Sequence, residues 1–307
     1  MNAPAAQHGL GKGIALIVLA FLCVAVMSAF GKAAGGVPIG QMVFFQSGIS
    51  LVLLAPLLLR GGLAPLRTSR LPMHLLRAFT GLASQALFFI AVQRMTLVDD
   101  VLLTNTAPLF IPLVALPWVR TPVGPAMIVS LLVGFAGVVL ILRPSAELMH
   151  NPAALLALGA GACSAMALVS VNQLAPTDSS QAILFYYFLI STIAAAPFAA
   201  MQWCVPTRTE WWLLGGVGVG MALAQLFIIM AYRHASAAQL APFNYSVVVF
   251  SGVIGWIVWH EALDMTALLG ILLVCAGGIA SIRTAPHIHG TSVMRSTTPV
   301  PRRDHAS

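Results

Sequence analysis

The fold of this chain is indicated by a stretch that occurs twice, 140 residues apart. Residues 131–143 read LLVGFAGVVLILR, and residues 271–283 read ILLVCAGGIASIR. This offset aligns Gly137 with Gly277 and Arg143 with Arg283, and it aligns six further pairs without a gap. The chain therefore consists of two similar halves. The further pairs are Cys23 with Cys163, Gln41 with Gln181, Phe45 with Phe185, Gln85 with Gln225, Ala91 with Ala231 and Phe110 with Phe250.

The composition indicates a chain that lies in a lipid bilayer. Of its 307 residues, 59% are hydrophobic and only 7% are charged, and the mean hydropathy is +0.94. A soluble domain carries about 25% charged residues, so this chain could not cover its surface with polar groups. Backbone groups in lipid must be satisfied within the protein, and runs such as residues 51–59 do not alternate as a β-barrel strand would. We therefore expect an all-α membrane protein.

Apolar runs between charged or Pro/Gly-rich breaks predict ten transmembrane helices, five in each half. A repeat with an odd number of spans is followed by a copy that enters the membrane from the other side. We therefore expect two inverted repeats, residues 13–143 and 153–283. The expected spans are residues 13–32, 38–59, 75–94, 97–117, 124–142, 153–172, 181–202, 211–232, 237–259 and 265–282.

The basic residues predict the orientation of the chain. With residues 1–12 in the cytoplasm, eleven basic residues fall on the cytoplasmic side and four on the outer side, as the positive-inside rule requires. We expect both termini in the cytoplasm, a location in the cell inner membrane, and a disordered tail over residues 284–307. The cytoplasmic set is Lys12, Arg60, Arg67, Arg70, Arg77, Arg120, Arg233, Arg283, Arg295, Arg302 and Arg303; the outer set is Lys32, Arg94, Arg143 and Arg208.

The first apolar run, residues 14–30, is also compatible with a cleaved signal peptide. It is long for such a segment and has a counterpart at residues 154–171, so we expect it to be retained as a membrane helix. Cysteine usage indicates no redox compartment. The four cysteines form no disulfide framework, and three of them lie in apolar runs where a thiol behaves as a small hydrophobic group.

The motifs of enzymes, cofactor sites and metal sites are incomplete in this sequence. His260-Glu261 begins like a zinc-binding motif, but Asp264 occupies the position of the second histidine. Gly9–Gly13 lacks the spacing and the Ser or Thr of a phosphate-binding loop. We therefore expect no catalytic residues, no cofactor and no metal. The basic residues are too scattered for a nucleic-acid site.

Polar side chains inside the expected spans are the candidates for a binding site. Such polarity is costly in lipid, so these residues either face a cavity or form hydrogen bonds between helices. The pairs Gln85/Gln225 and Thr104/Asn244 stand out because they occupy equivalent mid-span positions of the two halves. The substrate-binding candidates are Ser28, Gln46, Ser84, Gln85, Thr104, Asn105, Tyr187, Gln225, Asn244 and Tyr245.

Three acidic residues lie near the ends of expected spans. Asp99 and Asp100 fall in the first turn of the span 97–117, where the helix dipole stabilises negative charge, and Glu261 follows the span 237–259. These residues therefore either cap helix ends or form a proton or cation site at the outer mouth of the protein.

Several motifs also carry a resemblance to a known family. They comprise residues 38–45, TNTAPLF at 104–110, GFAGVVLILRP at 134–144, WHE at 259–261 and AGG at 276–278. With these motifs the chain resembles the EamA-type transporters of the drug/metabolite transporter superfamily over residues 13–283. The resemblance implies ten helices in inverted repeats around a central cavity, and export or uptake of small metabolites.

The chain departs from the family pattern at three places. Gln46 stands where the family commonly has Arg, and Thr121 stands where an acidic residue is expected. Val248 is the counterpart of Pro108, so the second half lacks that proline.

The inverted repeats and the lack of a nucleotide motif favour a secondary transporter that works by alternating access. We expect an amino acid, a nucleoside-like compound or a vitamin-like compound as substrate, and the lipid bilayer as the surroundings. Two alternatives stay open. An integral-membrane enzyme would need clustered His, Asp or Cys, and a non-transporting receptor or scaffold would need a larger partner-binding domain.

Overall fold

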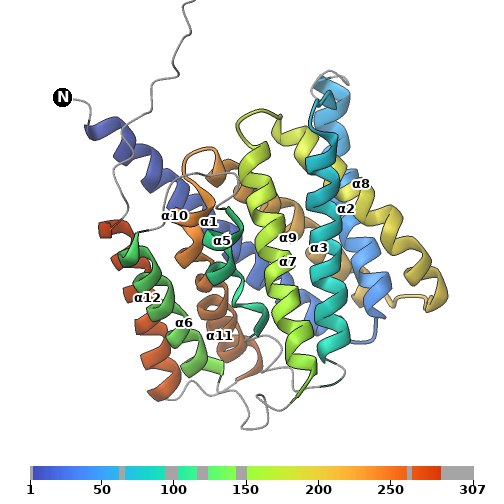
Figure 1. Ribbon diagram of the computed structural model, residues 1–307. Helices are drawn as coiled ribbons and strands as arrows, with labels where there is room; N and C mark the ends of the chain where they lie inside the picture. The colour runs from blue at the N-terminus through green and yellow to red at the C-terminus, as the bar shows by residue number, and fades with distance from the viewer. Residues whose placement is uncertain are drawn as a thin grey trace, which may run out of the picture.

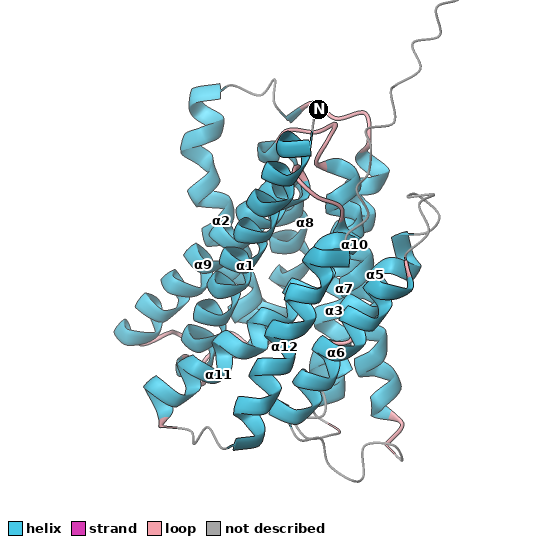
Figure 2. Ribbon diagram, turned by 90° about the vertical axis from the view of Figure 1, so that its left-hand side faces the viewer, coloured by secondary structure: helices cyan, strands magenta, loops and turns pink. Residues whose placement is uncertain are grey.

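The computed structural model describes residues 3–61, 66–92, 94, 103–115, 124–142, 151–260 and 265–284. Within these residues all regular structure is helical (Figures 1 and 2). The first half forms α1 (Ala3–Ala33), α2 (Ile39–Gly61), α3 (Leu71–Val92), α5 (Ala107–Ala115) and α6 (Pro125–Leu142). The second half forms α7 (Ala153–Leu174), α8 (Ser180–Met201), α9 (Arg208–Tyr232), α10 (Ala237–Leu240), the 3-10 helix η3 (Ala241–Tyr245), α11 (Ser246–Trp259) and α12 (Met265–Thr284).

Six helical stretches in the described part are long and apolar enough to cross a membrane. Two shorter ones, within α6 and α12, are also apolar. The expected all-α class is confirmed, whereas the number of ten spans stays a prediction. The six stretches are Gly9–Ala33, Ile39–Pro56, Ala153–Leu174, Ser180–Met201, Arg208–Tyr232 and Ala237–Val258.

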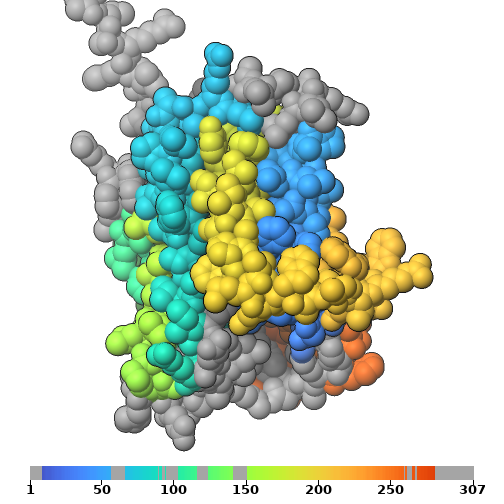
Figure 3. Space-filling view, turned by 90° about the vertical axis from the view of Figure 1, so that its right-hand side faces the viewer, coloured from blue at the N-terminus to red at the C-terminus, as the bar shows by residue number. Residues whose placement is uncertain are grey.

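The distribution of polarity is the reverse of that in a soluble protein. Large apolar side chains on the outside of the helices are strongly exposed, such as Val52 (70%), Leu155 (73%) and Phe198 (64%). Polar side chains such as Gln41 and Asn244 are buried between helices. One apolar face is formed by α8, which lies between α3 and α2 (Figure 3). A surface of this kind suits hydrocarbon, and the protein is a multi-pass membrane protein.

The two halves pack against each other in reciprocal pairs. The most extensive contacts join α6 to α12, α1 to α9, α3 to α7 and α2 to α8, and each pair takes one helix from each half. The first helix of one half thus meets the third of the other, second meets second and last meets last. The contacts of α1 with α11 and of α7 with α5 complete the pattern. Such reciprocity is what a two-fold axis between similar units produces.

The fourth helix of each half departs from α geometry in its middle. The expected span 237–259 is divided into α10, η3 and α11, and a mid-helix 3-10 stretch of this kind often marks a functional position. In the first half, residues 103–104 are helical, Asn105 and Thr106 form a turn, and α5 follows. Tyr245 is the counterpart of Asn105, so the two interruptions overlap in the repeat. The expected span 237–259 corresponds to the apolar stretch Ala237–Val258, and the 3-10 turn within it contains Pro242, which has no backbone N–H to donate.

The helices α6 and α12 approach each other at glycines that are repeat counterparts. A Cβ atom on Gly137 would lie 2.5 Å from the carbonyl oxygen of Gly270 and 2.8 Å from the backbone nitrogen of Val274. A Cβ atom on Gly277 would lie 2.7 Å from the carbonyl oxygen of Ser130. Backbone atoms cannot turn aside as a flexible side chain can. The contact therefore requires glycine in both helices.

Alanine at Gly137 or at Gly277 should lower the unfolding midpoint of the detergent-solubilised protein. We expect a loss of about 1–3 kcal/mol, the usual effect of overpacking a close contact. The matched control is Gly215→Ala in α9, where an added Cβ meets no atom within 4 Å. Alanine there should be neutral or stabilising, since it favours a helix over glycine by about 1 kcal/mol. Equal midpoints in all three variants would contradict the close contact.

Candidate functional site

Two of the expected substrate-binding residues form hydrogen bonds to backbone carbonyls. Ser28 is exposed on α1, and its hydroxyl donates to the carbonyl of Val24 one turn earlier at 2.8 Å. Ser84 is buried on α3, and its hydroxyl donates to the carbonyl of Ala160 on α7 at 2.8 Å. In both residues the hydroxyl already has a backbone acceptor. Gln46, another candidate, is buried within α2.

Buried polar groups without partners gather where the fourth helices are interrupted. Thr104, Asn244 and Tyr245, which we call the break-point residues, are counterparts or neighbours in the repeat. The Thr104 hydroxyl, both polar atoms of the Asn244 amide and the Tyr245 hydroxyl have no hydrogen-bond partner in the described part of the chain. Leaving such a group unsatisfied costs about 1–3 kcal/mol, so a bound ligand or a water molecule is needed to supply the missing hydrogen bonds.

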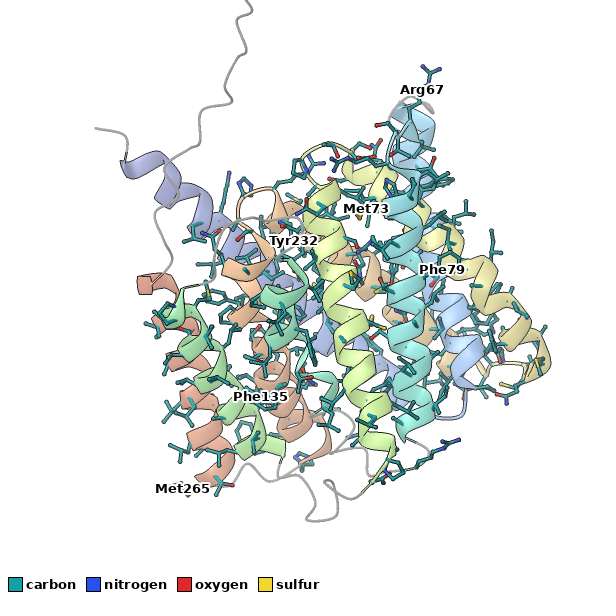
Figure 4. The ribbon with its side chains drawn as sticks, viewed as in Figure 1. Arg67, Met73, Phe79, Phe135, Tyr232 and Met265 are labelled. Atoms are coloured by element: carbon teal, nitrogen blue, oxygen red, sulfur yellow. The ribbon has the colours of Figure 1, made fainter. Side chains whose placement is uncertain are left out.

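The interruption in the second half lies at a junction of both halves. The helix η3 contacts α1, α5, α6 and α12. The Tyr245 ring lies over α6, with its centroid 6.4 Å from that of Phe135 and with Gly134 leaving room for it (Figure 4). Asn105 is half-buried beside Thr104 in the equivalent turn. Helices from both repeats thus surround the polar groups of η3.

A second polar group surrounds Arg77, which the sequence analysis counted on the cytoplasmic side although the expected span 75–94 contains it. The structure corrects this count, because α3 begins at Leu71 and Arg77 lies inside the bundle with 3% of its surface exposed. The guanidinium donates from Nη2 to the Gln225 side-chain oxygen at 2.7 Å and lies 4.3 Å from the centre of the Tyr187 ring. Without Arg77, the orientation count becomes ten basic residues against four.

The Arg77 group lies below one end of the bundle. Arg77 and Tyr187 follow the first residues of α3 and α8, and Gln225 precedes the last residue of α9, by six or seven positions in each helix. At 1.5 Å per residue these are depths of roughly 9–11 Å. Tyr232 at the end of α9 and Met73 near the start of α3 lie toward this same end (Figure 4). Three helices from both halves therefore bring these side chains to one level.

The two glutamines of the repeat are placed differently from each other. Gln225 bonds Arg77, whereas Gln85 lies two turns further along α3, in register with Arg77 and Gly81 at spacings of four. A Cβ on Gly81 would lie 3.3 Å from the Tyr187 ring, so this stripe of α3 faces α8. The face of α3 carrying Ser84 instead bonds α7. The face of α3 formed by Arg77, Gly81 and Gln85 is therefore the one that contacts Tyr187, and at Arg77 it also contacts Gln225.

A hydrogen bond between His74 and Asp178 joins the two halves at the rim above Arg77. The Nε2 atom of His74 lies 3.2 Å from Oδ1 of Asp178 in the α7–α8 connection, and both side chains are buried. Arg233 donates to the Asp178 backbone carbonyl at 3.0 Å, and Arg70 donates to the carbonyl of Gln173 at 2.9 Å. The Tyr186 ring packs on His74 at a centroid distance of 4.8 Å. We call His74, Asp178, Arg70, Arg233 and Tyr186 the rim cluster.

The sequence analysis missed the rim cluster and Arg77 for an identifiable reason. It searched for polar residues that have counterparts in the other half or lie mid-span. Arg77 corresponds to Val217, His74 to Leu214 and Asp178 to Pro38, so the repeat gives no signal for them. The available signal was Arg77 itself, a charged residue that lies inside the expected span 75–94.

The three acidic coupling candidates cannot be placed in this way. Asp99, Asp100 and Glu261 lie outside the described residues. Within the described ranges no three His, Cys, Asp or Glu side chains are grouped so as to hold a metal ion.

The rim carboxyl should make stability depend on pH. Burial alone would raise the pKa of Asp178, but hydrogen bonds from Thr68, Thr177 and His74, with the charge of His74, hold that pKa below its usual value. A lowered folded-state pKa stabilises the protein above the unfolded pKa of about 3.9, and this contribution is lost as pH falls through the folded pKa.

We expect Asp178→Asn to unfold at a lower temperature than the wild type at pH 7, with a difference that narrows below about pH 4. The measurement is the unfolding midpoint of both proteins across pH 7 to 3. The variant Thr192→Val serves as a control, because in the described part of the chain the Thr192 hydroxyl bonds the Phe188 carbonyl within its own helix, α8. A difference that stays constant with pH would contradict a stabilising charge at Asp178.

Comparison with known proteins places the chain among transporters. The sequence pattern of the EamA-like transporter family matches residues 11–143 and 151–283. The pseudopaline exporter of Pseudomonas aeruginosa is 31% identical over 277 residues, which are 90% of this chain and 97% of the exporter. A riboflavin transporter of Vibrio cholerae is 32% identical, over 78% and 82% of the two chains.

Two further comparisons agree with this result. An S-adenosylmethionine uptake transporter of Rickettsia bellii is 27% identical over 76% of this chain and 80% of its own length. A solved crystal structure superposes with a TM-score of 0.78 at 19% identity, covering 88% of this chain and 96% of the other, and so supports the fold. From its two matched repeats and its relatives, this chain belongs to the EamA-like transporter family.

Proposed function

We propose that this protein is a secondary transporter that moves a small metabolite by alternating access, and that the substrate binds at the break-point residues. The observation that carries the proposal is the coincidence of interrupted helices and partnerless polar groups in equivalent parts of the repeat. Transporters built from inverted repeats bind their substrates near mid-membrane at discontinuous helices. A substrate there would supply the hydrogen bonds that Thr104, Asn244 and Tyr245 lack.

The reciprocal packing supports a rocking motion in this proposal. Each extensive helix pair joins one half to the other, so a movement of the halves changes the two ends of the bundle in opposite senses. The glycine contact of α6 with α12 holds one such pair close at both counterparts, Gly137 and Gly277. Access would then alternate about this contact while the break-point residues stay near the axis.

The proposed substrate is an amino acid, a nucleoside-like compound or a vitamin-like compound. The relatives named for riboflavin and S-adenosylmethionine fit this range, because riboflavin is a vitamin and S-adenosylmethionine joins a nucleoside to an amino acid. An ion gradient or the substrate gradient would drive the movement. Asp99, Asp100 and Glu261 remain the proposed residues for ion or proton coupling.

The proposed topology has ten spans, both termini in the cytoplasm and the cell inner membrane as location. Its support is the excess of basic residues at the ends assigned to the cytoplasm. In a cysteine-free background, Ser69→Cys and Thr209→Cys place single thiols at exposed positions that the proposal assigns to opposite sides. An impermeant maleimide applied to intact spheroplasts should label Thr209→Cys and leave Ser69→Cys until the cells are opened. The reverse pattern would overturn the orientation.

Substitution of the break-point residues should reduce transport more than stability. We expect Asn244→Leu and Thr104→Val to lower transport per folded molecule by roughly fivefold or more, since each lost hydrogen bond is worth about 1 kcal/mol. The measurement is counterflow into proteoliposomes with a metabolite panel that includes riboflavin and S-adenosylmethionine. Thr192→Val is again the control, because its hydroxyl is satisfied within its own helix.

Two results would contradict this proposal. Transport of no compound in the panel by the wild type would remove the transporter function for these substrate classes. Full transport by folded Asn244→Leu and Thr104→Val would move the substrate away from the interrupted helices.

A further inference from the structure

We infer that the transported metabolite carries a carboxylate, and that Arg77 binds this carboxylate with the help of Tyr232. The inference rests on the proposed transport function and names the chemical class of its substrate. It starts from a buried positive charge for which the described residues provide no negative partner.

Arg77 is a buried cation without a carboxylate partner among the described residues. Its two close partners, the Gln225 amide oxygen and the Tyr187 ring, are both neutral. None of the described carboxylates lies within ion-pair distance of it. Guanidinium groups stay protonated in proteins, and buried charges are normally paired. An intramembrane charge without such a partner points to a substrate or ion pathway.

Two hydrogen-bond donors at this place still need acceptors. The Nε atom of Arg77 is buried without a partner, and so is the hydroxyl of Tyr232. Tyr232 follows Gln225, the partner of Arg77, by seven residues on α9 and therefore lies on the same side of that helix. A guanidinium edge and a phenol match a carboxylate, which accepts several hydrogen bonds at once.

The neighbouring side chains fix the guanidinium for this task. Gln225 accepts from Nη2, and the guanidinium carbon of Arg77 lies over the Tyr187 ring, 4.3 Å from its centre. The absence of a side chain at Gly81 lets Tyr187 approach α3. This arrangement leaves the Nε edge as the place for an incoming acid. Gln85 lies on the same face of α3, eight residues after Arg77, and places a neutral polar side chain near the middle of that helix.

The position favours a small metabolite over a lipid headgroup. Arg77 lies between α3, α8 and α9 with 3% of its surface exposed, whereas Phe79 on the outer side of α3 is 58% exposed. A lipid phosphate would reach the outer face of these helices. A small carboxylate that enters from the end of the bundle would reach the inner side.

The test is binding of matched ligand pairs to the purified protein, measured by thermal stabilisation. The probes are S-adenosylmethionine with its decarboxylated form, each amino acid with its amide, and riboflavin, which has no carboxylate. We expect at least one acid to stabilise the wild type and its partner without the carboxylate to have far less effect. Arg77→Gln should weaken binding of that acid by roughly two orders of magnitude.

Further variants keep the test independent of folding defects. Arg77→Lys retains the charge without the planar fork and should bind the acid with intermediate affinity. Tyr232→Phe removes only the hydroxyl and should weaken binding by roughly tenfold. Arg208→Gln removes an exposed arginine at the other end of α9 and should leave binding unchanged. Anionic lipid vesicles added to the wild type should not compete with the acid.

The outcomes separate this inference from the proposed function. Equal binding of an acid by wild type, Arg77→Gln and Tyr232→Phe overturns the role of Arg77. If only neutral compounds stabilise the protein and are transported, the inferred carboxylate on the substrate is wrong, whereas the proposed transport function is retained. Competition by anionic vesicles assigns the charge to lipid and also overturns the inference. Failure of every compound to bind or to be transported overturns the proposed function together with the inference.

Discussion

The structure depends on one physical constraint, the lack of hydrogen-bonding partners in hydrocarbon. Every polar group that a membrane helix carries must be satisfied inside the protein or by what the protein binds. The bundle meets this constraint for many of its hydroxyls through backbone carbonyls, as Ser50 does with the carbonyl of Gly218. Gln41 does the same at one end of the bundle, where its side chain bonds the backbone of Cys204. Groups that stay unsatisfied are therefore informative.

Two sets of unsatisfied groups differ in how they relate to the repeat. The break-point residues occupy equivalent parts of the two halves, and the helix pairs around them are reciprocal. Arg77 and the rim cluster belong to one end alone, since Val217 and Leu214 stand at the positions that correspond to Arg77 and His74. A two-fold architecture thus carries an asymmetric charge. In a transporter this combination would make the two open states chemically different, because a buried arginine stands at one end and Val217 at the equivalent position of the other.

The sequence predicted the class of the fold and the family, because both depend on features that repeat. Apolar runs of membrane length predict helices wherever they occur, and the counterparts Gly137 and Gly277 mark a contact that both halves use. The span 237–259 was found, but hydropathy does not indicate the 3-10 turn around Pro242 that interrupts it. The sequence also drew attention to Asn244 and Thr104, but nothing in it distinguishes their free side chains from the bonded Ser84.

Arg77 was misassigned because the positive-inside rule counts basic residues near the end of a span with the adjoining loop, and Arg77 is the third residue of the expected span 75–94. The helix begins four residues before that boundary, at Leu71, so Arg77 lies more than one turn inside it. Its partners could not be predicted either. Tyr187 and Gln225 come from helices far away in the chain, and only tertiary packing brings them together. Polarity in a span indicates that a partner is needed, whereas the fold decides which one it is.

The location of the rim cluster connects the two parts of the molecule. His74 and Arg77 are three residues apart on α3 and therefore share a side of that helix. Arg77 lies beneath the contact of His74 with Asp178, of Arg70 with the Gln173 carbonyl and of Tyr186 with the carbonyl of Leu66. A solute that reached Arg77 from this end would have to separate α3 from the α7–α8 connection, and these contacts join the two halves. If the proposed function holds, the structure described here is closed at this end, and opening it breaks the rim contacts before Arg77 meets water.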